Sequence, residues 1–167
     1  MFYFEFCKDK PAKKISWAAS IGSESKEDLD MMEPILKERL RNFDYISVRE
    51  RETVDFVQSL TDKDVFHAID PVLMLDKKDY DELLENVENN FGEYIYAYLF
   101  DNVEGGYETI NKLSSHLNLP VIANVKELNR IDNLLLDSED DGPCEMLERI
   151  VNAEFIITDS FHVMIYA

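Results

Sequence analysis

Four short segments of this 167-residue sequence combine residue types that bind anions or transfer protons. Each segment follows or precedes a predicted strand or helix. The four segments are Ser20-Ile21-Gly22-Ser23, Ser47-Val48-Arg49-Glu50, Gly105-Gly106 and Thr158-Asp159-Ser160-Phe161-His162. The planar guanidinium of Arg49 is suited to phosphate or carboxylate. The imidazole of His162 can donate or accept a proton near neutral pH. These residue types favour an anionic substrate and a reaction that includes a proton transfer.

Two of these residues also have a structural interpretation. Arg49 could form only an ion pair with Glu50 or Glu52 at the start of a helix. His162 could be a half-buried histidine whose hydrogen bonds are satisfied within the fold. Spacing alone leaves both interpretations open.

Parallel strands are expected to position these residues. Short apolar runs predict strands at residues 14–20, 45–48, 65–69, 94–100, 120–124, 134–136 and 155–158. Helical periodicity lies between them, with one helix starting at Pro34 and others at residues 52–60, 77–91, 105–116 and from Pro143 onward. This alternation predicts an α/β fold, a Rossmann-like parallel sheet with helices on both faces. Strands 14–20, 45–48 and 94–100 are expected to be buried.

The sequence predicts two halves. Residues 1–76 form part of a first Rossmann-like half, and residues 77–167 form a second half that is truncated at its end. Apolar residues at both ends of the chain predict a fragment of a longer protein. Arg49 and His162 are expected at carboxyl ends of strands, each on a different half and facing a common cleft, because ligands of open parallel sheets bind there.

Composition excludes several classes of protein. The net charge of -18 argues against a nucleic-acid partner, and 23 of the 35 acidic side chains lie in residues 61–167. No apolar run is long enough to span a membrane. Two distant cysteines, Cys7 and Cys144, predict reduced thiols and a cytoplasmic protein, with Cys144 in the core.

No metal or cofactor is expected. Cysteine and histidine do not cluster at the spacing of zinc ligands. The segment from Asp137 to Glu148 partly matches a calcium-binding EF-hand loop, but Glu139 is too long for the third position and a strand-like run precedes it. An acidic loop that caps a helix is the better interpretation.

Four segments, in this order, resemble the polysaccharide pyruvyl transferase family. They are Lys14–Gly22, Asp44–Glu50, Ile69–Leu73 and Gly142–His162. The run from Ala153 to His162 is the most specific, because it joins a strand, its cap and a histidine. The resemblance covers nearly the whole chain but only the middle of the family's usual length, and the family's glycine-rich opening segment is absent.

The resemblance implies a bilobed, glycosyltransferase-B-like architecture and the transfer of an enolpyruvyl group from phosphoenolpyruvate to a saccharide hydroxyl in surface polysaccharide biosynthesis. His162 matches the functional histidine, and Arg49 matches the arginine that contacts phosphoenolpyruvate. Ser20, Gly22 and Ser160 are further candidates for substrate binding. Two positions depart from the family pattern: Ser160-Phe161 stands where some members have Arg-Leu, and Val163 stands where glycine is usual.

Two alternative functions stay open. One is a nucleotide-sugar-dependent glycosyltransferase of similar two-lobe fold, because a fold does not determine its chemistry. The other is a non-catalytic domain that has kept the fold and lost the site. No oligomeric state is predicted.

Overall fold

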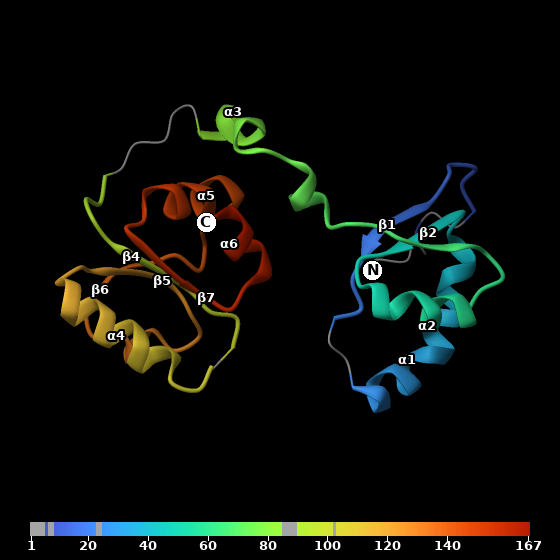
Figure 1. The fold of residues 1–167 in the computed structure, drawn as a ribbon, viewed down its shortest axis with the longest axis horizontal. Helices are drawn as coiled ribbons and strands as arrows, with labels where there is room; N and C mark the ends of the chain where they lie inside the picture. The colour runs from blue at the N-terminus through green and yellow to red at the C-terminus, as the bar shows by residue number, and fades with distance from the viewer. Residues whose placement is uncertain (1–5, 7–8, 23–24, 85–89, 102) are drawn as a thin grey trace. The chain divides into compact units, whose positions relative to one another are not determined.

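The computed structural model describes residues 6, 9–22, 25–84, 90–101 and 103–167 (Figure 1). The chain divides into two compact units, Met1–Met74 and Leu75–Ala167, which we call unit 1 and unit 2. The strands are β1 (Ile15–Ala19), β2 (Tyr45–Val48), β3 (Val65–His67), β4 (Ile95–Tyr98), β5 (Val121–Asn124), β6 (Leu134–Asp137) and β7 (Phe155–Thr158). The α-helices are α1 (Lys26–Arg39), α2 (Val54–Ser59), α3 (Asp81–Leu84), α4 (Gly106–Leu117), α5 (Pro143–Asn152) and α6 (Phe161–Tyr166). Short 3-10 helices lie at Leu40–Asn42, Arg51–Thr53, Pro71–Met74, Lys77–Tyr80 and Leu128–Arg130.

Within the described residues, each unit contains one sheet, and both sheets are parallel throughout. The strand order is β1-β2-β3 in unit 1 and β6-β5-β4-β7 in unit 2. Helices alternate with the strands along the chain, as expected where parallel strands need crossover connections. The predicted α/β class is confirmed.

In unit 1 the helices cover one face of the sheet. Leu36 of α1 and Val57 of α2 pack with Ile46 and Val48 of β2 in a single core cluster. Because successive crossovers run in the same direction across β1, β2 and β3, both helices lie on the same side. Phe66, on the opposite face, is 56% exposed. The expectation of helices on both faces is therefore wrong for the described part of unit 1.

β1 is an edge strand and is more exposed than expected. Ile15 and Trp17 are 52% and 57% exposed, so the prediction that residues 14–20 are buried is wrong. The register with β2 shifts between Ser16 and Ala19, and Ala18 has a φ of +47°. Such a bulge is common at sheet edges. Residues 45–48 and 94–100 are buried as predicted, apart from the exposed Tyr45 and Phe100 and the half-buried Tyr98.

Two helix predictions need correction. α1 begins at Lys26, because Ser25 and Asp28 form a reciprocal capping box, so Pro34 lies inside the helix and does not start it. Of the helix predicted at residues 77–91, the structure shows a 3-10 turn followed by α3, which ends at Leu84. The rest of that prediction partly lies outside the described residues, as do Cys7, Ser23 and the apolar start at residues 1–4.

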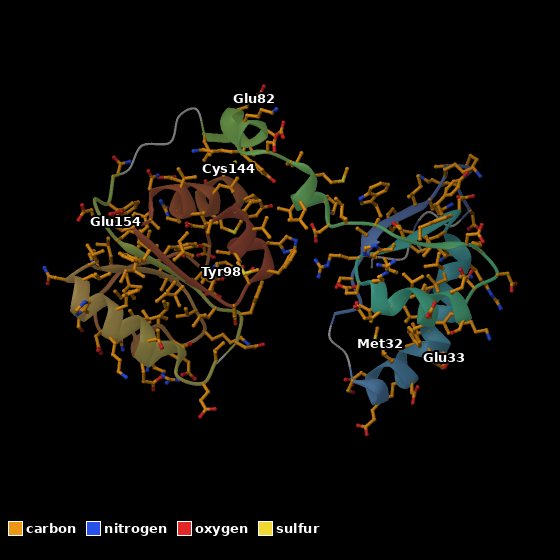
Figure 2. All side chains as sticks on the ribbon, in the orientation of Figure 1. Met32, Glu33, Glu82, Tyr98, Cys144 and Glu154 are labelled. Atoms are coloured by element: carbon orange, nitrogen blue, oxygen red, sulfur yellow. The ribbon has the colours of Figure 1, made fainter. Side chains whose placement is uncertain are left out.

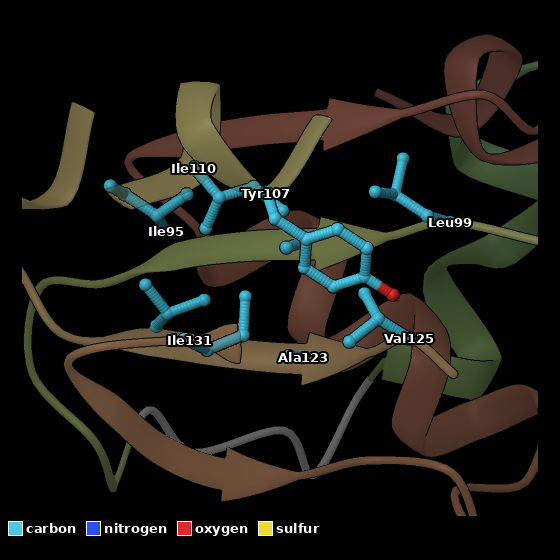
Figure 3. Close-up of a cluster of buried hydrophobic side chains, with 9 residues drawn as sticks. Ile95, Leu99, Tyr107, Ile110, Ala123, Val125 and Ile131 are labelled. Carbon is cyan, nitrogen blue, oxygen red and sulfur yellow. The ribbon is translucent and has the colours of Figure 1, made fainter. Parts of the chain in front are cut away.

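In unit 2 helices cover both faces of the sheet, as predicted. Figure 3 shows Tyr107 and Ile110 of α4 over Ile95 and Leu99 on one face. On the other face, a second cluster joins Tyr94, Tyr96 and Ile122 to Ile150 of α5 and Val163 of α6. Strand residues therefore alternate between two apolar layers, as in parallel sheets buried on both sides.

Cys144 does not lie in this core. It is exposed in the first turn of α5 (Figure 2), where Pro143 and Glu145 are also exposed. The buried face of α5 consists of Leu147, Ile150 and the paired Arg149. The prediction that Cys144 lies in the core is therefore wrong. Among the described residues, no helix combines the length and apolar character that crossing a membrane requires.

Candidate functional site

Arg49 lies at the carboxyl end of β2 and joins the ends of all three strands of unit 1. Its Nε lies 3.0 Å from Glu50 Oε1, and its Nη1 lies 2.7 Å from Asp70 Oδ2. Its Nη2 donates to Ser20 Oγ, beyond β1, at 3.0 Å. The guanidinium is thus fixed by one residue after each strand.

Ser20 and Gly22 belong to the same network. The Ser20 hydroxyl donates to Glu50 Oε1 at 2.6 Å and accepts from the backbone N–H of Gly22 at 3.0 Å. Gly22 has a φ of +80°, a conformation that other residues rarely adopt. The structure therefore brings three of the predicted site residues together in unit 1.

Asp70 is a member of this network that the sequence analysis did not identify. Its side chain is 8% exposed, and its second oxygen, Oδ1, accepts from the backbone N–H of Val72 at 3.0 Å. Asp70 stands in an Asp-Pro pair just beyond β3, and that position was the available signal.

His67 was also missed. It ends β3, and its Nε2 lies 3.1 Å from the carbonyl oxygen of Arg49. Its position in the sequence was again the available signal, because His67 is a titratable side chain at the carboxyl end of an apolar strand. The imidazole of His67 therefore lies beside the backbone of Arg49.

Two carboxylates surround one guanidinium in this cluster. The hydrogen bond to Asp70 is the main reason that the pKa of Arg49 is raised above its usual value. Burial acts to raise the pKa of Glu50, but hydrogen bonds from Ser20 and Arg49 outweigh it, and the pKa lies below the usual value. The Glu50 carboxylate is therefore charged at neutral pH. Glu50 Oε2 is buried without a hydrogen-bond partner.

His162 lies in unit 2, in the first turn of α6 and just beyond β7. The Ser160 hydroxyl caps this helix by accepting from the backbone N–H of Val163 at 3.4 Å, and the Ser160 N–H donates to Thr158 Oγ1 at 2.9 Å. Ser160 is buried, whereas His162 is exposed and its ring contacts Phe161 edge-on at 5.4 Å. The imidazole of His162 is therefore accessible to solvent, and the Ser160 hydroxyl serves as the helix cap.

The carboxyl ends of β7 and β4 are tied together by Asp159. Its Oδ1 accepts from the backbone N–H of Phe100 at 2.9 Å, and its Oδ2 accepts from that of Asp101 at 3.4 Å. Val163 is 1% exposed and helical, so this position needs no left-handed conformation and packs against the sheet. The family's usual glycine is not required by the backbone here.

The remaining segments have structural roles. Gly105 caps α4 with a φ of +74°, and a Cβ on Gly106 would lie 3.3 Å from Leu99 Cδ1. The acidic segment begins at Asp137, the last residue of β6, and leads into α5, so it lacks the leading helix of an EF-hand. Within the described ranges, no three His, Cys, Asp or Glu side chains are grouped as metal ligands.

These features define an α/β protein with polar clusters at the carboxyl ends of parallel strands, where such folds bind ligands. The family model for polysaccharide pyruvyl transferase matches residues 1–167. The chain belongs to the polysaccharide pyruvyl transferase family, a family of transferases. No curated protein and no solved structure matches the chain, so the family model carries this assignment.

Proposed function

We propose that this protein transfers the pyruvyl group of phosphoenolpyruvate to hydroxyl groups of a saccharide. The observation that supports the proposal most is the position of Arg49 and His162 in a chain that belongs to this family. Arg49 directly follows β2 in unit 1, and His162 lies in the first turn of α6, four residues after the end of β7 in unit 2, so each is near the carboxyl end of a parallel strand, where open α/β folds bind ligands. A bilobed, glycosyltransferase-B-like architecture is part of the proposal.

The proposed chemistry needs one proton donor and cationic groups. A proton adds to the methylene carbon of phosphoenolpyruvate, which leaves positive charge at the carbon that carries the phosphate. A saccharide hydroxyl attacks that carbon and loses its proton. A second hydroxyl then displaces phosphate and gives the ketal, while its proton leaves with the phosphate. Proton transfer by a positioned side chain accelerates such steps by about 10²–10⁴-fold.

Arg49 is the proposed ligand for the anionic groups of phosphoenolpyruvate, and the cluster suggests how it is reached. Asp70 is almost buried and has a second anchor in the N–H of Val72, whereas the Glu50 side chain is 25% exposed. We therefore expect the incoming anion to displace Glu50 and to leave the pair between Arg49 and Asp70 intact. Asp70 then orients the guanidinium, and Ser20 and Gly22 line its other side.

His162 is the proposed proton-transfer residue. Its exposure allows contact with a substrate, and the Ser160 cap together with the Asp159 contacts holds the turn on which it sits. No cofactor has a role in this chemistry. Backbone N–H groups near Ser160 take the place of the arginine that some relatives have there.

Ligand-dependent melting of the full-length protein tests the substrate. Phosphoenolpyruvate at about 100 times its dissociation constant should stabilise the protein by about 2.7 kcal/mol, and nucleotide sugars should not. Arg49→Lys keeps the charge but loses the planar fork, so the shift with phosphoenolpyruvate should be mostly lost. Arg130→Lys, which changes a surface arginine of unit 2 paired with Glu127, is the matched control. A shift with nucleotide sugars alone would favour the glycosyltransferase alternative.

A non-catalytic domain is the second candidate, and one observation favours it. Arg49 is already paired with two carboxylates, which makes the cluster negative without any ligand. Glu50→Gln distinguishes the two functions. If Arg49 binds phosphoenolpyruvate, removing the competing charge should tighten binding. If the network is only structural, the variant should show no binding of phosphoenolpyruvate at all.

A further inference from the structure

A basic pocket of about 220 Å³ lies on unit 1, away from the Arg49 cluster. It forms between the end of α1, with the 3-10 turn that follows, and the loop that leads into β3. Its polar and charged lining residues are Lys37, Arg41, Ser59, Thr61, Asp62 and Lys63. These residues precede β2 and β3, so the pocket lies at the amino ends of these strands, whereas the Arg49 cluster lies at their carboxyl ends.

Positive charge gathers here in a protein that is strongly acidic. Three cations and one carboxylate line the pocket, in a chain whose net charge is -18. Lys37 and Arg41 are exposed and one helical turn apart, so their charges repel each other. Neither side chain forms an ion pair or a hydrogen bond with the described residues. An anion between them would relieve this repulsion.

The third cation, Lys63, is held in place by hydrogen bonds to the backbone. Lys63 Nζ donates to the carbonyl oxygens of Leu40, Arg41 and Phe43 at the end of the helix. It therefore offsets the partial negative charge of that helix end, which would otherwise repel an anion. Gln58 Nε2 holds the loop by donating to the carbonyls of Thr61 and Lys63 at 3.3 and 2.9 Å.

The pocket also offers hydroxyl groups. Thr61 Oγ1 accepts from the backbone N–H of Lys63 at 3.3 Å, which leaves its own proton for a ligand acceptor. Ser59 donates to the carbonyl of Phe56 at 2.6 Å, which leaves an acceptor lone pair for a ligand hydroxyl. The pocket has a volume of about 220 Å³, which is enough for one sugar ring.

We propose that this basic pocket binds a carboxylate-bearing sugar unit of the saccharide, at a second site separate from the site of transfer. The saccharide as ligand rests on the proposed function. A saccharide that has received pyruvyl groups carries a carboxylate at each one, and an acidic protein surface repels it. The basic pocket supplies the local attraction, with Lys37 and Arg41 on the carboxylate and the hydroxyls of Thr61 and Ser59 on the ring.

Binding of small probes to the full chain tests this proposal without measuring activity. Methyl glucuronide, an acidic sugar, should shift the amide signals of residues 37, 41 and 59–63 in NMR spectra. Methyl glucoside, its neutral counterpart, and inorganic phosphate should bind much more weakly. The double variant Lys37→Gln/Arg41→Gln should weaken glucuronide binding by about tenfold, which corresponds to 1.4 kcal/mol. The control, Lys77→Gln/Lys112→Gln, removes the same charge from unit 2 and should change nothing.

Three results would overturn the proposal. They are glucuronide shifts that do not reach the pocket, equal weakening by the control pair, and binding of phosphate in preference to glucuronide. The melting experiment with phosphoenolpyruvate is independent of these residues. Failure of that experiment alone would therefore count against the proposed transfer and not against the basic pocket.

Discussion

The two units are built from the same kind of sheet but are stabilised in different ways. In unit 2 the sheet is covered on both faces, and Ile95, Tyr96 and Ile122 are fully buried. In unit 1 one apolar cluster covers one face, and a groove of about 500 Å³ beside β1 reaches Leu36 and Val57 of that cluster. Hydrophobic burial therefore contributes more to unit 2, and polar contacts at the strand ends contribute relatively more to unit 1.

This difference indicates that a polar network with a functional role can form in the less covered unit. The Arg49 cluster links the ends of three strands in the less covered unit, so it has both a structural and a proposed binding role. His162 stands on a turn of the well-packed unit, and its side chain is exposed. Substitutions in the Arg49 cluster should therefore change both stability and activity, whereas a substitution of His162 should change mainly activity.

The largest expected effect on stability is that of a core truncation in unit 2. Ile95→Ala should lower the free energy of unfolding by about 3 kcal/mol, because the residue is completely buried. Phe66→Ala, on the exposed face of unit 1, should cost less than about 1 kcal/mol. Urea denaturation measures both, with Trp17 fluorescence reporting on unit 1 and circular dichroism on the whole chain. Equal losses of unfolding free energy in the two variants would contradict the difference in packing between the units.

Alkaline pH should weaken unit 2. Burial is the main reason that the pKa values of Tyr94 and Tyr96 are raised to about 12. In the unfolded chain these phenols ionise near their usual value of about 10, so their contribution is complete below that pH and is lost as the pH rises towards 12. At pH 11 the loss should be about 1.4 kcal/mol for each tyrosine. Tyr96→Phe should lose less stability than the wild type between pH 9 and 11.

How far the sequence predicts this structure depends on whether the signal is local. β7 was predicted at its observed bounds, and Arg49 and His162 were placed correctly after β2 and β7, because short apolar runs mark buried parallel strands. The sequence did not reveal that β1 is an exposed edge, since strand order depends on contacts between distant segments. It also missed Asp70 and His67, whose proximity to Arg49 exists only after β2 and β3 pair. The ion pair between Arg49 and Glu50 was one interpretation that the sequence left open, whereas the pair with Asp70 depends on a contact between distant segments.

Two buried tyrosines, Tyr94 and Tyr96, allow a hydroxyl that forms a hydrogen bond to be compared with one that forms none. Tyr94 OH donates to the carbonyl of Arg149 at 3.0 Å, so Tyr94→Phe should cost about 1 kcal/mol. The Tyr96 hydroxyl and Ser138 Oγ lie near each other in the core, but neither has a hydrogen bond of acceptable geometry. Tyr96→Phe should therefore be nearly neutral at pH 7. A cost for Tyr96→Phe equal to that for Tyr94→Phe would mean that the two buried hydroxyls do bond.

The smallest expected effect is the acid sensitivity of the Arg49 cluster. The pKa of Glu50 is lowered in the folded state, so its stabilising contribution is complete above its usual value near 4.5 and is lost as the pH falls through the lowered value. Glu50→Gln removes this group, so unit 1 of the variant should show a shallower loss of stability on the acid side. Trp17 fluorescence during melting between pH 6 and 3 measures the slope. An unchanged slope would show that Glu50 does not stabilise unit 1 through its charge.

The most direct test of pyruvyl transfer is phosphate release from phosphoenolpyruvate by the full-length protein with a saccharide acceptor, compared for wild type, His162→Asn and His116→Asn. His116 is an exposed histidine on α4 and serves as the matched control. We expect His162→Asn to lower turnover by about 100-fold or more without lowering the melting temperature, because the side chain is exposed, and we expect His116→Asn to have no effect. Unchanged turnover in His162→Asn, or equal loss in both variants, would contradict the assigned role of His162.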